Sequence, residues 1–176
     1  GSMGGALAQA AVKTAGGGRV AVACSTPEHS EEAAARLGCA AETAETILWE
    51  SRFVFLGVKP QMIAGVVKKL AGDIAGSDAI FVSMLAGTSL ERLAELLGTD
   101  KKIIRIMPNT PCAVGQGLTL VAPNDRVTAE ELADFKALLS ASGLLDDLPE
   151  HLIDAASAVS GCGPAYAYMF MEALAD

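Results

Sequence analysis

The chain has 176 residues, 51% of them hydrophobic and 19% charged, and a formal net charge of −8 from 13 basic and 21 acidic side chains. This much apolar material excludes a disordered chain, and the acidic balance argues against a nucleic-acid surface, which needs a basic stripe. No apolar run reaches the ~18 residues of a membrane span, and no basic segment followed by an apolar stretch marks a secretory signal. We therefore expect a cytoplasmic protein with a substantial core.

Residues of the types that ligate metals are few and scattered. The cysteines and histidines are Cys24, Cys39, Cys112, Cys162, His29 and His151. No two cysteines form a C-x-x-C pair, so we expect neither a zinc site nor a disulfide framework. The thiols are expected to be reduced and mostly buried, and the two histidines, which stand among charged residues, to be solvated.

Apolar strand-like runs alternate with helical patterns along the first 150 residues. The first half predicts helices at 6–14, 30–37, 42–50 and 61–70, strands at 19–24, 53–58 and 79–85, and an extended piece near 39. The second half predicts helices at 88–98, 128–142, 152–160 and 164–176, and strands at 102–107, 118–122 and 144–148. Capping boxes open the helices at 88 and 128. This alternation predicts an α/β fold with a doubly wound parallel sheet, and a domain boundary where the strands stop, near 150–160.

The first residues fit such a domain poorly, because it should open with a strand. Residues 1–5 read Gly-Ser-Met-Gly-Gly before an alanine-rich helix. They are either a Gly-Ser cloning remnant before a start methionine or the end of a G-x-G-x-x-G phosphate loop. In the second case Gly1 and Gly4 are the second and third glycines of the loop, and the first strand is missing.

The end of the next strand bears on cofactor choice. It reads Cys24-Ser25-Thr26-Pro27, with two hydroxyls and no acid. An NAD site often has an Asp or Glu here to bind the ribose 2′-hydroxyl, so the hydroxyls favour the 2′-phosphate of NADPH. The alternative is that Ser25 and Thr26 only cap the following helix.

Four further motifs lie at predicted strand ends or helix starts. They are Gly57-Val58-Lys59-Pro60, Ala86-Gly87, Met107-Pro108-Asn109-Thr110-Pro111 and Ser160-Gly161-Cys162-Gly163-Pro164. The first could meet a phosphate through its lysine, and the second leaves room for a flat ring. The third is stiffer than a random surface loop needs, and the last offers an anion-ready helix start. Ordinary turns are the alternative for each.

Together these motifs resemble one family. MPNTP, SGCGPAYAYMFMEALAD, GVKP and the opening GSMGGALA match pyrroline-5-carboxylate reductases in order and spacing. The resemblance implies an NAD(P)H-dependent reductase that makes L-proline from 1-pyrroline-5-carboxylate. It implies a Rossmann-like dinucleotide-binding domain at 1–150, its first strand apparently missing. It also implies the beginning of an all-α dimerisation domain at 151–176, and hence a homodimer or higher homo-oligomer.

The resemblance also assigns residues, with NADPH as the expected cofactor and NADH as possible. The cofactor-binding set is Gly1, Ser2, Met3, Gly4, Ser25, Thr26, Gly57, Val58, Lys59, Pro60, Ala86, Gly87, Met107, Pro108 and Asn109. The substrate-binding set is Asn109, Ser160, Gly161, Cys162, Gly163 and Pro164. No catalytic residue is assigned, because hydride transfer to a cyclic iminium needs mainly proximity and orientation. Cys162 stands where a serine is common, and Met169 where some members have threonine.

Two alternatives remain at this point. One is another NADP-linked Rossmann reductase, such as a relative of the hydroxyacid dehydrogenases, although no lysine follows Lys136 to act on an interdomain helix. The other is a nucleotide-binding module without activity. The last predicted helix is apolar around most of its circumference, so it must be covered by further residues or by a second subunit.

Overall fold

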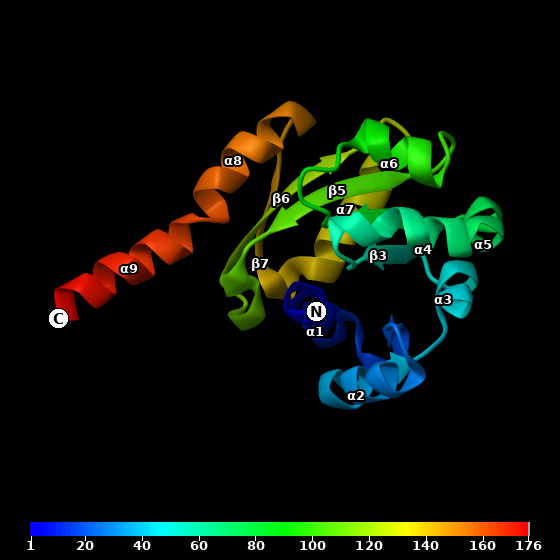
Figure 1. The fold of residues 1–176 in the computed structure, drawn as a ribbon, viewed down its shortest axis with the longest axis horizontal. Coiled ribbons are helices and arrows are strands. Elements are labelled where there is room, and N and C mark those ends of the chain that lie inside the picture. The colour runs from blue at the N-terminus through cyan, green and yellow to red at the C-terminus, as the bar shows by residue number, and fades with distance from the viewer. Residues whose placement is uncertain (176) are drawn as a thin grey trace.

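A computed structural model describes residues 1–175 of the chain (Figure 1). In chain order the helices are α1 (Ser2–Ala15), α2 (Pro27–Leu37), α3 (Ala44–Glu50), α4 (Ile63–Lys69), α5 (Ala71–Gly76), α6 (Leu90–Leu97), α7 (Ala129–Leu139), α8 (Ile153–Ser160) and α9 (Gly163–Ala175). The strands are β1 (Ala21–Val22), β2 (Ala40–Ala41), β3 (Phe53–Leu56), β4 (Ile80–Ser83), β5 (Ile103–Pro108), β6 (Gly117–Pro123) and β7 (Gly143–Asp147).

The main sheet has five strands in the order β3-β4-β5-β6-β7. Its first three strands are parallel, as predicted, and so are β6 and β7, but β5 and β6 are antiparallel. The predicted doubly wound parallel sheet is therefore confirmed, with one antiparallel pairing that the sequence did not predict. Only a short 3₁₀ turn, Thr110–Val114, connects β5 to β6, and a parallel crossover needs a connection of a dozen residues or more.

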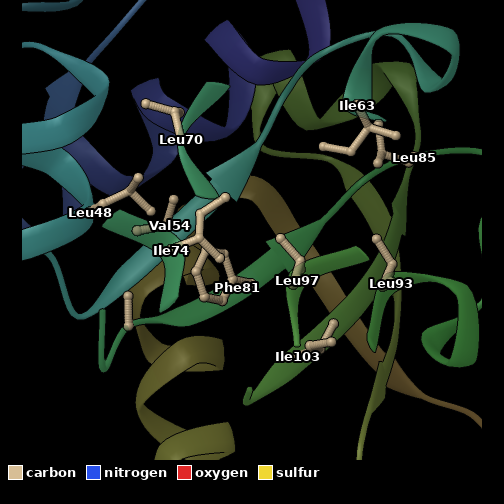
Figure 2. Packing of buried hydrophobic residues seen from close by; sticks show 11 residues of the cluster. Leu48, Val54, Ile63, Leu70, Ile74, Phe81, Leu85, Leu93, Leu97 and Ile103 are labelled. Carbon is tan, nitrogen blue, oxygen red and sulfur yellow. The ribbon is translucent and has the colours of Figure 1, made fainter. Parts of the chain in front are cut away.

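Helices cover both faces of this sheet, which makes it doubly wound. Neighbouring residues of β4 point to opposite faces: Phe81 packs in one core, and Ile80 and Val82 pack in the other. The first core, shown in Figure 2, joins the sheet to α3, α4, α5 and α6. The second joins it to α1 and α7 through Leu7 and Phe135. The all-apolar strands of the sequence are thus buried from both sides, as a Rossmann-like sheet requires.

The strand predicted at 19–24 is reduced to two residues. β1 pairs with β2 in a separate two-stranded sheet, with Ala21 opposite Ala40. Residues Gly17–Arg19 form a 3₁₀ turn, so the extended segment begins later than expected. Among the described residues β1 pairs with β2 alone, so no hydrogen bonds to a second neighbouring strand extend it.

The sequence predicted capping boxes at the starts of two helices, and the structure confirms one of them. The capping box at Thr128 is present, with reciprocal bonds of 3.2 and 2.9 Å to Glu131. The box predicted at Thr88 is wrong by one residue: Ser89 caps α6 and accepts the N–H of Arg92 at 3.1 Å. Thr88 is buried instead.

Other helix boundaries differ modestly from the predictions. α1 begins at Ser2 and α2 at Pro27, several residues before the starts expected at 6 and 30. Helical structure expected to end at Leu70 resumes in α5 despite Gly72.

Of the four free thiols only Cys112 is buried, so the expectation of mostly buried cysteines is wrong. His29 and His151 are both exposed, as predicted.

The two C-terminal helices are separated by a turn at 161–162, as the sequence predicts. α9 extends away from the rest of the molecule (Figure 1) and buries no residue. Its exposed apolar side chains are Tyr166, Tyr168, Met169, Phe170, Met171 and Leu174. Within residues 1–175, no helix is both long enough and apolar enough to cross a membrane.

Candidate functional site

A cleft of about 340 Å³ lies where β3, β4 and β5 end next to the start of α1. Its lining residues are Gly1, Ser2, Met3, Gly4, Gly57, Val58, Lys59, Pro60, Met84, Ala86, Met107 and Pro108. The three strands are parallel, so their carboxyl ends share one edge of the sheet. This edge is where open α/β sheets bind their ligands.

The start of α1 supplies unpaired backbone donors to the cleft. Gly1 is the N-cap, and the first helical bond runs from the Gly5 N–H to the Gly1 carbonyl at 2.9 Å. The N–H groups of the first turn therefore have no carbonyl partner within the helix. That turn contains no acidic residue, and a Cβ placed on Gly4 would meet no protein atom within 4 Å. This arrangement suits a phosphate close to the backbone.

The charge of the cleft is opposite to that of the whole protein. Lys59 has the only charged side chain of the lining, and no acidic side chain is among the lining residues, whereas the chain carries −8. The lysine and the positive end of the α1 dipole therefore both favour an anionic ligand. The residues present thus fit the pyrophosphate of a dinucleotide.

One part of the cleft lining is apolar. It consists of Ala86, Pro108, Met84 and Met107, at or next to the ends of β4 and β5. The sequence prediction missed Met84. The period-two alternation could have found it, because Ile80, Val82 and Met84 lie on one face of the extended segment.

Ser25 and Thr26 lie outside this lining, at the exposed start of α2. Thr26 caps the helix, and its Oγ1 accepts the N–H of His29 at 3.3 Å. The capping interpretation therefore describes what Thr26 does in the fold. Glu28 follows within the same turn, and backbone hydrogen bonding together with the Thr26 hydroxyl lowers the pKa of its carboxyl group.

Two other predicted cofactor residues also lie outside the lining. Gly87 forms a left-handed turn after β4, with φ of 68°. Asn109 directly follows Pro108, but its amide is engaged by the protein. Its Nδ2 donates to the Ser160 carbonyl at 3.0 Å, and its Oδ1 accepts the Leu118 N–H at 2.9 Å.

The predicted substrate residues 160–164 do not line the cleft. They are connected to it through Asn109, which follows the lining residue Pro108 and hydrogen-bonds the Ser160 carbonyl. The Ser160 hydroxyl is buried and has no hydrogen-bond partner among the described residues. Cys162 is exposed, and its carbonyl accepts the N–H groups of Ala165 and Tyr166. Since Pro164 has no N–H and the Ala165 N–H is already bonded, the N–H groups of Cys162 and Gly163 are the donors that this turn can offer to an anion.

An ionic group that the sequence analysis missed joins α8 to the sheet. Arg105 of β5 is buried, and its guanidinium contacts Asp154 at 2.6 Å and Glu150 at 3.1 Å. The partners are 49 and 45 residues away in sequence, so no local motif could reveal the group. Within residues 1–175, no group of three or more potential ligands could hold a metal ion.

The fold and the cleft define a Rossmann-like domain with a dinucleotide-type site. A family model described as "NADP oxidoreductase coenzyme F420-dependent" matches residues 1–87, and one described as "Pyrroline-5-carboxylate reductase dimerisation" matches residues 150–176. The pyrroline-5-carboxylate reductase of Escherichia coli (strain K12) is 40% identical over 137 residues, which are 78% of this chain and 51% of that protein.

Solved structures agree with these matches. A 1-pyrroline-5-carboxylate reductase from Streptococcus pyogenes is 32% identical with a TM-score of 0.89, over 99% of this chain and 65% of that one. The Plasmodium falciparum pyrroline carboxylate reductase, solved with NADP bound, is 25% identical with a TM-score of 0.85, over 99% of this chain and 64% of that one. The chain belongs to the pyrroline-5-carboxylate reductase family. It spans about half the length of the curated relatives it matches.

Proposed function

We propose that the protein containing this chain reduces 1-pyrroline-5-carboxylate to L-proline with hydride from NADPH, and that NADH serves as a second donor. The observation that carries the proposal is the cleft at the ends of β3, β4 and β5, whose only charged side chain is Lys59. The relatives at about 40% identity, which are named for this reaction, support the substrate. The Plasmodium falciparum structure with NADP bound supports the cofactor.

The residues of the cleft take distinct parts in this proposal. The N–H groups of residues 2–4 bind the pyrophosphate, and Lys59 adds a positive charge beside it. Val58 and Pro60 line the groove, and Ala86, Met107 and Pro108 pack against the nicotinamide. When bound, the nicotinamide supplies the hydride. The hydroxyls of Ser25 and Thr26 contact the adenosine 2′-phosphate.

The substrate lies between the nicotinamide and the start of α9. The N–H groups of Cys162 and Gly163 bind its carboxylate at a helix N-terminus that contains no acidic residue in its first turn. Cys162 is a weaker hydrogen-bond donor than the serine common in the family, and Met169 gives no hydrogen bond to the imine. The site therefore acts through proximity and orientation, with no general acid required from the side chains.

The whole protein is proposed to be a cytoplasmic homodimer or larger homo-oligomer. The exposed apolar side chains of α9 and the match of residues 150–176 to a dimerisation model support this assembly. A second subunit would cover α9 and complete the substrate pocket that residues 160–164 only begin.

The test is NADPH oxidation by the whole protein with pyrroline-5-carboxylate, followed by absorbance. Lys59→Ala should raise the KM for NADPH about fivefold, because one exposed charge pair is worth about 1 kcal/mol, and Lys59→Arg should retain the wild-type value. Lys69→Ala removes the same charge from the exposed end of α4 and serves as the matched control. A wild-type protein that ignores pyrroline-5-carboxylate but reduces a 3-oxo acid would refute the proposal.

A further inference from the structure

Helix α8 carries the predicted substrate turn but has little apolar contact with the rest of the molecule. Ile153 is its only buried residue, and the other seven are exposed or half-buried. Burial of one isoleucine cannot fix both ends of a helix, so polar contacts must set its position.

The first end of α8 is held by Arg105. The side chain of Arg105 is 4% exposed, and it contacts Asp154 in the first turn of the helix and Glu150 just before it. Glu150 Oε1 also accepts the N–H of Leu90 at the start of α6, at 2.6 Å. This group ties the beginning of α8 to β5 and α6.

At the second end, Asn109 makes the only hydrogen bond from the side chain of another element among the described residues. Its Nδ2 donates to the carbonyl of Ser160, the last residue of α8, and its Oδ1 accepts the N–H of Leu118 in β6. Both partners are backbone groups of fixed polarity, so the orientation of the amide is determined. The residue before Asn109 is Pro108, which lines the apolar end of the cleft.

We propose that Asn109 is a positioning residue for the substrate: its bond to the Ser160 carbonyl fixes the turn at 161–163 relative to Pro108 and the nicotinamide end of the cleft. The inference rests on the proposed function. Its Nδ2 and its Oδ1 each already bond a backbone group, so the role proposed for Asn109 is to act on the reaction through the turn. Loss of the bond lets the turn shift away from the substrate carboxylate that it is proposed to bind, so the substrate should bind more weakly and its KM should rise.

Asn124 provides a matched control at the other end of β5. Its Nδ2 donates to the Lys101 carbonyl at 2.9 Å, and its Oδ1 accepts the Ile103 N–H at 3.2 Å. Replacing either asparagine with aspartate keeps the oxygen that accepts the N–H but turns the donor into a second oxygen facing a carbonyl. Asn109→Asp and Asn124→Asp therefore break equivalent bonds, and only the first touches α8.

The experiment compares these variants in the whole protein. Asn109→Asp should raise the KM for pyrroline-5-carboxylate on the order of tenfold while the Kd for NADPH stays within about twofold. Asn124→Asp should leave both constants unchanged at a similar loss of thermal stability. Equal effects of the two variants on the substrate KM would overturn the proposal, as would an equal loss of NADPH affinity and substrate affinity in Asn109→Asp.

Hydrogen exchange supplies a readout that needs no turnover. Amide exchange at residues 157–163 should rise in Asn109→Asp and stay unchanged in Asn124→Asp, and unchanged exchange in both would refute the role. If the aspartate variant does not fold, Asn109→Ser and Asn124→Ser remove the same bonds without a charge. A wild-type protein inactive on pyrroline-5-carboxylate, with raised exchange in Asn109→Asp, would refute the proposed function but not the bond's hold on the turn.

Discussion

The exposed start of α2 permits a test of cofactor choice that leaves the fold intact. Thr26 caps α2 through its side-chain oxygen, and aspartate is at least as good an N-cap as threonine. Thr26→Asp should therefore preserve the helix while placing a carboxylate where the proposed 2′-phosphate of NADPH would lie. NADH has no such phosphate, so its binding should be nearly unaffected.

The expected magnitude follows from the exposure of the site. A carboxylate about 5 Å from a phosphate of charge about −1.5 to −2 is repelled by roughly 1–2 kcal/mol in a solvent-exposed setting. That energy corresponds to a rise of about tenfold in the KM for NADPH. Because the charges are exposed, the effect should shrink as salt approaches about 1 M.

Steady-state kinetics with each cofactor, at low and high salt, measure the change in KM and its salt dependence directly. Thr43 caps α3 in the same way, accepting the N–H of Thr46 at 3.1 Å, so Thr43→Asp is the matched control. Equal increases in KM for NADPH and NADH would refute the assignment of Thr26 to the 2′-phosphate. So would an effect of Thr43→Asp as large as that of Thr26→Asp.

Four further predictions concern stability and assembly. Gly143 has φ of 127°, and a Cβ there would lie 2.2 Å from the Gly117 carbonyl oxygen, so Gly143→Ala should lower the free energy of unfolding by more than about 3 kcal/mol in urea titration. Gly65→Ala, in open space on α4, should instead raise it by up to about 1 kcal/mol. A hydrogen bond from Lys102, and after it one from the Thr128 N–H, lowers the pKa of Glu131 below its usual 4.5. The ionised Glu131 carboxylate therefore stabilises the fold above pH 4.5, and this stabilisation is lost as the pH falls through the lowered pKa of the folded state. The difference in Tm between wild type and Glu131→Gln should accordingly close in acid. Phe170→Glu on α9 should shift the whole protein toward monomer in sedimentation, and an unchanged assembly would exclude α9 from the interface.

Local and periodic signals were sufficient for most of the fold. The strand predicted at 102–107 is present as β5, and the capping box at Thr128 gives the start of α7. The two-residue β1 was overestimated because its length depends on a neighbouring strand rather than on its own sequence. The antiparallel step at β6 depends on how the 3₁₀ turn after Pro108 directs the chain, which periodicity does not encode.

Part of the candidate site could likewise be predicted from local sequence, and part depends on tertiary contacts. The cleft residues stand at strand ends and at the start of a helix, so the βα pattern and the family motifs together place them. The hydrogen bond from Asn109 to the Ser160 carbonyl and the ionic contacts of Arg105 join segments 45 to 51 residues apart, and no local sequence motif reveals them. The family motifs name Asn109 and Ser160, but the contact between them becomes visible only when the fold is known.

The methionines of the cleft also make the site sensitive to oxidation. Three of the six methionines, Met3, Met84 and Met107, line this one cavity. Peroxide converts a thioether to a polar, chiral sulfoxide, which would place oxygen atoms in a surface otherwise suited to a flat apolar ring. A bound dinucleotide would cover these sulfurs, so the occupied protein should resist oxidative inactivation longer than the empty one. Repair by methionine sulfoxide reductases would restore the wall without new synthesis.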